Sequence, residues 1–155
     1  MRDDTRLAVS WRARPRSFLA LMALYESNFL RLQALCGTVS QLRGCHLSRV
    51  PGDCDLSVVV EEQTPYTTTL TLTYQFEEPG PPLDGQPPMA RVPDLNVRVY
   101  ADARVAEARF REVAKPSGMK SGRAVAEREL EQRWSANMLL NKWLEYCLER
   151  GHRIR

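Results

Sequence analysis

YTTTLTLTYQF, residues 66–76, is the stretch that decides the fold class. From Thr69 to Phe76, threonines and one glutamine alternate with leucines, a tyrosine and a phenylalanine. Successive side chains of a β-strand point to opposite faces of its sheet, so this strand has one polar and one apolar face. The stretch therefore predicts a sheet that buries one face in the core and leaves the other open.

Further strands flank this stretch on both sides. DLSVVV, residues 55–60, precedes it, and the connecting EQTPY contains Pro65, which interrupts strand pairing. So short a link favours an antiparallel pair. VRVYADARVAEARF, residues 97–110, predicts a hairpin that turns at Asp102, because a short carboxylate accepts hydrogen bonds from nearby backbone N–H groups. We therefore expect four mostly antiparallel strands.

Two amphipathic helices are predicted at the ends of the chain. Apolar residues recur at three- and four-residue steps from Pro15 to Cys36 and again from about Arg123 to Arg150. A glycine follows each segment, Gly37 in the first case, and suits the left-handed residue that ends a helix. Both helices are expected on the apolar face of the sheet, which makes the fold class α+β with a four-stranded antiparallel sheet.

The predicted domain is single and spans residues 15–151, with a flexible basic tail at residues 1–14. A Pro-rich segment at residues 77–94 holds six of the ten prolines and is expected to form a long exposed loop. The net charge of +3 equals the excess of arginine over aspartate within residues 1–16. That tail is expected to be solvated, with attraction to a phosphate backbone or an acidic partner as the alternative.

Composition indicates a globular cytoplasmic protein. Apolar residues make up 43% of the chain and charged residues 26%. No apolar run is long enough to cross a membrane, and the arginine-rich start lacks the apolar core of a secretory signal. The neighbours Cys36, Cys45 and Cys54 are nine residues apart, too far for the close ligand pairs of structural zinc. We expect no metal and no cofactor.

Catalytic patterns are weak in this sequence. Its two histidines are His46, in a predicted loop, and His152, in a tail that is expected to fray after Gly151. Asp102 and Glu107 are a turn residue and a strand residue, so their carboxylates need not converge. No catalytic residue is predicted, and enzyme chemistry is the third of three functional hypotheses.

A binding surface is the more favoured prediction. Threonines, two tyrosines and two arginines share the open sheet face, a set that suits base stacking or phosphate binding, although threonine-rich wet strands are common in scaffolds. The candidate ligand- or partner-binding residues are Tyr66, Thr68, Arg98, Tyr100, Asp102, Glu107, Arg109, Glu131, Arg133 and Asn137.

Three segments together resemble the YqiB-like family, a bacterial family of unknown function. They are YESNFLRLQAL (25–35), YTTTLTL (66–72) followed by VRVYADARVAEA (97–108), and ANMLLNKWLEYCLERG (136–151). The chain departs from the family where Glu131, Gln132 and Arg133 replace an Asp-Glu-Lys run, which weakens a proton-transfer role there. The resemblance implies a bacterial cytoplasmic protein and supplies no activity.

The leading functional hypothesis is a non-catalytic binding or adaptor module that uses the open sheet face together with the Pro-rich loop. The alternative is a regulatory protein that binds nucleotides or RNA through the tyrosines and arginines of that face. An enzyme with an acidic site would require Asp102, Glu107, Glu131 and Arg133 to converge.

Overall fold

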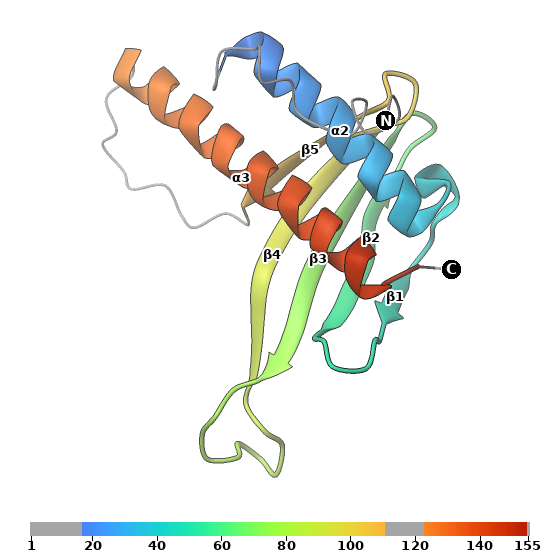
Figure 1. The fold of residues 1–155 in the computed structure, drawn as a ribbon, viewed down its shortest axis with the longest axis vertical. Helices are drawn as coiled ribbons and strands as arrows, with labels where there is room; N and C mark the ends of the chain where they lie inside the picture. Colours follow the sequence, from blue (N-terminus) through green and yellow to red (C-terminus); the bar gives the residue numbers. More distant parts are fainter. Residues whose placement is uncertain (1–16, 111–122, 155) are drawn as a thin grey trace.

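The computed structural model describes residues 17–110 and 123–154 and has an α+β fold. Helices α2 (Phe18–Cys36) and α3 (Arg123–Arg150) lie side by side across one face of an antiparallel sheet (Figure 1). The strands are β1 (Cys45–Ser48), β2 (Asp55–Gln63), β3 (Thr67–Glu77), β4 (Met89–Tyr100) and β5 (Val105–Phe110), and a 3-10 helix η1 (Val39–Gln41) follows α2. Their order across the sheet is their order along the chain.

The sheet has five strands, so the prediction of four strands is wrong by one. The missed strand is β1, which pairs antiparallel with β2 through Cys45 opposite Val59 and Ser48 opposite Leu56. Its sequence, CHLS, is too short to show a period of two, so a pattern of apolar residues cannot reveal it. The α+β class and the two helices on one face are confirmed.

Helix α2 begins later than predicted. Ser17 is its N-cap, and the Ser17 hydroxyl accepts a hydrogen bond from the N–H of Ala20 at 3.1 Å. Phe18, predicted on the buried face, is 76% exposed in the first turn. The helix ends at Gly37, whose φ of 69° is a conformation that only glycine adopts without strain.

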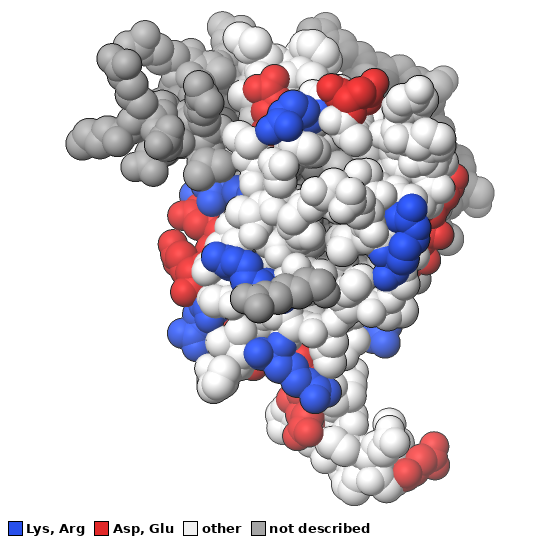
Figure 2. All heavy atoms as spheres, turned by 90° about the vertical axis from the view of Figure 1, so that its right-hand side faces the viewer, with Lys and Arg blue, Asp and Glu red and all other residues white. Residues whose placement is uncertain are grey.

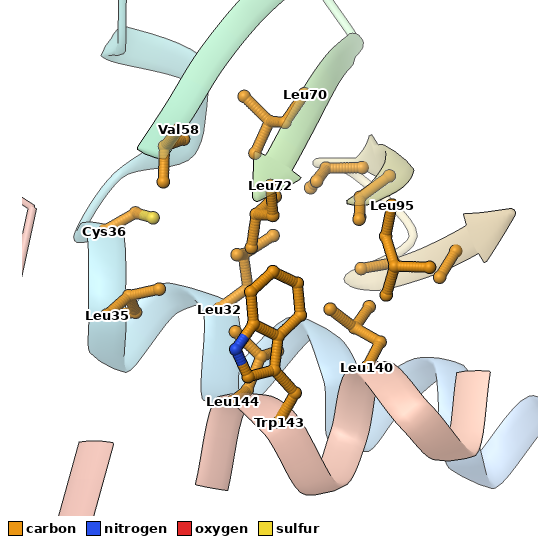
Figure 3. Close-up of a cluster of buried hydrophobic side chains, with 14 of the residues drawn as sticks. Leu32, Leu35, Cys36, Val58, Leu70, Leu72, Leu95, Leu140, Trp143 and Leu144 are labelled. Carbon is orange, nitrogen blue, oxygen red and sulfur yellow. The ribbon is translucent and has the colours of Figure 1, made fainter. Parts of the chain in front are cut away.

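The core lies between the helices and the apolar face of the sheet. Figure 3 shows Leu140, Trp143 and Leu144 of α3 pointing toward Leu72 and Leu95 of the sheet. Alternate residues of the strands supply this face, as the pattern in residues 66–76 predicted. Burial of such leucines contributes about 2 kcal/mol each, so this layer is the main source of stability.

Strands β3 and β4 continue beyond the helices as a two-stranded arm, which projects at the bottom of Figure 1. Phe76 lies opposite Ala90, and Glu77 lies opposite Met89. The irregular loop is therefore residues 78–88, shorter than the predicted 77–94. Hereafter the arm denotes residues 75–92.

Edge strand β5 has its outer backbone groups bonded by a buried asparagine. The Asn137 side chain accepts a hydrogen bond from the N–H of Ala108 at 2.7 Å and donates one to the Ala108 carbonyl at 3.1 Å. Its amide thus takes the place of a neighbouring strand. An open edge invites pairing with another chain, and this contact blocks that edge at its centre.

The same asparagine links α3 to α2. The Asn28 side chain donates to Oδ1 of Asn137 at 3.1 Å, and the Asn141 side chain donates to Oδ1 of Asn28 at 3.1 Å. Asn141 also donates to the Ser27 hydroxyl at 2.9 Å. All four polar side chains are at least 97% buried, and each has a partner, as buried polar groups require. This asparagine cluster joins both helices to β5.

We predict that Asn137→Ala lowers the free energy of unfolding by about 3 kcal/mol, because it leaves the buried N–H and C=O of Ala108 without partners. Urea unfolding followed by circular dichroism measures the change. Lys142→Ala, at an exposed site on the same helix, is the control and is expected to change it by less than about 0.5 kcal/mol. Equal effects of the two substitutions would contradict a capping role for Asn137.

Candidate functional site

The open sheet face, which lies opposite the helices, carries the threonines of β3, of which Thr71 and Thr73 are buried and Thr69 is half-buried. Thr69 lies opposite Arg98, and Thr71 lies opposite Asn96. The Thr71 hydroxyl donates to the Glu61 carboxylate at 2.9 Å, and the Thr73 hydroxyl donates to the Asp94 carboxylate at 2.9 Å. These hydroxyls therefore already have partners, and acidic groups stand among them.

The arginines of this face lie beside a carboxylate. Arg98 is directly opposite Glu107 in the β4–β5 pair. Arg109 donates from Nε to the Glu107 carboxylate at 3.1 Å, and the Glu107 side chain is only 15% exposed. The open face consequently has mixed charge. A phosphate-binding surface needs an excess of positive charge, which this arrangement reduces.

The remaining strand-side candidates lie at different places. Tyr66 is 68% exposed in the turn before β3, whereas Tyr100 is partly buried at the end of β4. Thr68 points to the helix side, and its hydroxyl donates to the side chain of Gln63. Asp102 accepts a hydrogen bond from the N–H of Ala103 at 3.0 Å in the β4–β5 turn. The two tyrosines and Thr68 thus do not share one surface.

One of the α3 candidates, Arg133, lies near the buried Tyr25. Arg133 donates to the Glu129 carboxylate at 2.8 Å, while Glu131 is exposed. Burial raises the pKa of Tyr25, and Glu107 raises it further, whereas Arg133 and Arg109 act to lower it. Glu107 and Arg133 therefore come close enough to influence one hydroxyl.

This proximity does not extend to all four residues of the hypothetical acidic site. Asp102 is exposed in the β4–β5 turn, where its carboxylate bonds to the turn backbone. Glu131 is exposed on α3. Of that set, the structure thus brings together only Glu107 and Arg133, and it places Tyr25 and Arg109 beside them. The sequence analysis did not connect Tyr25 or Arg109 with Arg133.

A hydrogen-bonded chain of serine, histidine and aspartate lies at the other edge of the sheet. The Ser48 hydroxyl is 2.9 Å from His152 Nδ1, and His152 Nε2 is 2.9 Å from the Asp53 carboxylate. His152 has no exposed surface, and the Asp53 side chain is 6% exposed. The prediction that His152 lies in a fraying tail is wrong.

Tyr74 and Cys147 extend this cluster into the core. The Tyr74 hydroxyl donates to the Asp53 carboxylate at 3.1 Å and lies 3.1 Å from Cys147 Sγ. Burial raises the pKa of Cys147 to about 11, so its thiol stays protonated at neutral pH and is a poor nucleophile. Burial also raises the pKa of Tyr74. These groups are hydrogen-bonding partners and not reactive groups at pH 7.

The cluster fastens the end of the chain to the sheet. After Gly151, the N–H of Arg153 donates to the Ser48 hydroxyl at 3.3 Å, and the N–H of Ile154 donates to the Leu35 carbonyl at 2.9 Å. Ile154 is buried. Because His152 is fully buried between its two partners, a substrate does not reach its ring in this conformation. The hydrogen bonds of Ser48, His152 and Asp53 therefore support an anchoring role.

Sequence reasoning missed this cluster because its members are far apart in the chain. Ser48 and Asp53 are 104 and 99 residues from His152. The one local signal is the apolar Ile154, two residues after the histidine, which is unusual in a solvated tail.

Asp53 makes the stability of the anchor depend on pH. Burial acts to raise its pKa, but hydrogen bonds from the Cys54 backbone, His152 and Tyr74 together hold that pKa below the ordinary aspartate value. A lowered pKa contributes stability above the unfolded pKa, and this stability is lost as pH falls through the folded pKa. We predict that Asp53→Asn lowers the free energy of unfolding at pH 7 by about 2 kcal/mol.

This difference between Asp53→Asn and wild type should shrink as pH falls below the ordinary aspartate pKa. Denaturant unfolding at a series of pH values measures it. Asp55→Asn is the matched control, since Asp55 forms only an exposed ion pair with Arg49 at 3.3 Å. A pH-independent loss in Asp53→Asn would show that its charge does not stabilise the anchor.

Among residues 17–110 and 123–154, no group of three or more His, Cys, Asp and Glu side chains is arranged to hold a metal ion. Neither described helix is both long enough and apolar enough to span a membrane.

Comparison with known proteins places the chain in a family. The family model described as "Protein of unknown function (DUF1249)" matches residues 31–153, a range that includes all five strands, Asn137 and His152. No curated protein and no solved structure matches the chain. The match covers most of the 155 residues, and the chain therefore belongs to the DUF1249 family of proteins of unknown function.

Proposed function

We propose that this protein is a non-catalytic adaptor that binds a protein partner through its open sheet face and the adjoining arm. The observation that carries the proposal is the set of apolar side chains that the arm exposes to solvent. They are Phe76, Leu83, Met89 and Val92, which are 37%, 70%, 53% and 64% exposed. Several exposed apolar side chains on one projecting element are typical of protein-interaction sites.

The shape and charge of the arm support this proposal. Figure 2 shows the projecting end of the arm as largely uncharged, with one acidic patch at its tip, whereas Glu77, Glu78 and Arg91 lie nearer its base. Met89 lies opposite Glu77, so its side chain points to the sheet side opposite Phe76, which lies opposite Ala90. A partner could thus contact apolar groups on both sides of the arm. The threonines and paired charges of the open face would form the polar rim of such an interface.

Nucleotide or RNA binding is the weaker alternative. Its support is the exposed Arg98 beside Tyr100 on β4. Against it stand the Arg109–Glu107 ion pair and the carboxylates of Glu61 and Asp94 on the same face. The ion pair leaves Arg109 less available to a phosphate, and the two carboxylates would repel a phosphate backbone.

Catalysis has less support than either binding hypothesis. The buried thiols have raised pKa values, about 12 for Cys36 and about 11 for Cys147, in both cases because of burial. The Ser48 hydroxyl belongs to a buried chain that holds the C-terminal segment. On the basis of the YqiB-like resemblance, we propose that the protein acts in the bacterial cytosol. A bacterial lysate is therefore the material in which to seek its partner.

The test is affinity purification from a native bacterial lysate at low and high salt, followed by binding measurements with the purified partner. We expect a protein partner that stays bound at high salt. The double substitution Met89→Ser, Val92→Ser should weaken binding by at least about tenfold, since buried apolar anchors carry much of the binding energy of an interface. Both residues are exposed, so the fold should remain intact.

Leu19→Ser is the matched control, because Leu19 is also an exposed apolar residue, at 72%, but lies at the start of α2. Binding that is weakened as much by the control as by the arm substitutions would contradict the role of the arm. Recovery of salt-labile RNA or a nucleotide, lost in Arg98→Ala, would replace this proposal with the alternative.

A further inference from the structure

A hollow of about 200 Å³ lies between the end of α2, η1 and the β4–β5 turn. Its walls are apolar at Phe29, Val39, Val99 and Ala101, and polar at Gln33, Thr38, Ser40 and Thr68. Arg104 is the one charged residue among those that line it. The hollow is separate from the arm and from the Ser48, His152 and Asp53 chain, so it is independent of the function proposed above.

Arg104 is held over the hollow by an uncommon backbone conformation. Its φ is 56°, in the left-handed region that few residues other than glycine adopt. The guanidinium carbon lies 5.0 Å from the centre of the Phe29 ring, and this cation–π contact fixes the flat group against an apolar wall. Left-handed residues that are not glycine concentrate at ligand sites, where surrounding structure maintains the strain.

The guanidinium of Arg104 has no anionic partner within residues 17–110 and 123–154. Among the described residues, no carboxylate forms an ion pair with it. The Phe29 ring offers no acceptor oxygen, so this contact does not use up the guanidinium N–H groups, which match the two oxygens of a carboxylate. The Thr38 side chain does not cap η1, so its hydroxyl is a second group that could bind a ligand.

The size of the hollow limits what it can hold. Pockets for drug-sized ligands are roughly 300–1,000 Å³, so this one suits a smaller molecule and excludes most of a nucleotide. One guanidinium balances one negative charge. The apolar walls favour a ligand whose remaining part is a short hydrocarbon or a single ring.

We propose that this hollow binds a small organic carboxylate, with the carboxylate on Arg104 and its apolar part against Phe29 and Val99. Benzoate is the probe, and benzamide is its uncharged counterpart of the same shape. In two-dimensional NMR of the ¹⁵N-labelled full chain, benzoate should give saturable shifts of the Thr38, Ala101 and Arg104 amides. Benzamide should bind at least about tenfold more weakly, because a charge-assisted pair contributes more than a neutral hydrogen bond.

Two substitutions distinguish binding at Arg104 from a general attraction of benzoate to positive charge. Arg104→Asn removes the guanidinium but tolerates the left-handed conformation, so the fold should persist and benzoate affinity should fall at least about tenfold. Arg128→Gln removes the same charge from an exposed site on α3 and should leave affinity unchanged.

Three outcomes would overturn the proposal. The first is the absence of saturable shifts at the millimolar concentrations where ligands of this size bind, both for benzoate and for hexanoate, a carboxylate whose apolar part is a short hydrocarbon. The second is equal binding of benzoate and benzamide. The third is equal loss of affinity in Arg104→Asn and Arg128→Gln, which would assign the effect to net charge.

Discussion

The bidentate contact between the Asn137 amide and the Ala108 backbone is the interaction on which the rest of the structure depends. It satisfies one N–H and one C=O that β5 would otherwise expose at a sheet edge. It also sets the position of α3 along β5, because a side-chain amide reaches only one residue of the strand. Through Asn28 and Asn141 the same network sets α2 against α3, and the apolar layer then packs between helices of defined position.

The opposite side of the sheet is secured by different chemistry. There, His152 bridges Ser48 of β1 and Asp53 of the β1–β2 connection, and Ile154 is buried against the core. The cluster contains residue types that often perform catalysis, yet their burial and shared hydrogen bonds assign them to anchoring. Residue identity alone is therefore a poor guide to chemistry in this protein, since exposure and partners determine whether a group can react.

Two kinds of surface on the described part of the chain are candidates for recognition. The arm exposes apolar groups next to an open face whose charges are largely paired, which favours a protein partner over a polyanion. The hollow at Arg104 combines apolar walls with a guanidinium that no carboxylate of the described residues pairs with, which favours a small anion. These two surfaces differ in size and charge, so one protein can use them for different ligands.

The sequence by itself determined the features that depend on near neighbours. Alternation in residues 66–76 predicted that Leu70, Leu72 and Tyr74 face the core, although the predicted open face is itself buried at Thr71 and Thr73. Helical periodicity predicted α3 as Arg123–Arg150, and Gly37 predicted the end of α2. Each follows from the preference of a single segment for one conformation and one buried side. Only the tertiary structure decided that CHLS forms β1, that Asn137 caps β5 and that Arg104 lies on Phe29. The partner of a polar or charged side chain depends on which distant residues the fold brings within hydrogen-bonding distance. His152 and Asp53, 99 residues apart in the chain and 2.9 Å apart in the fold, depend on tertiary structure for this reason.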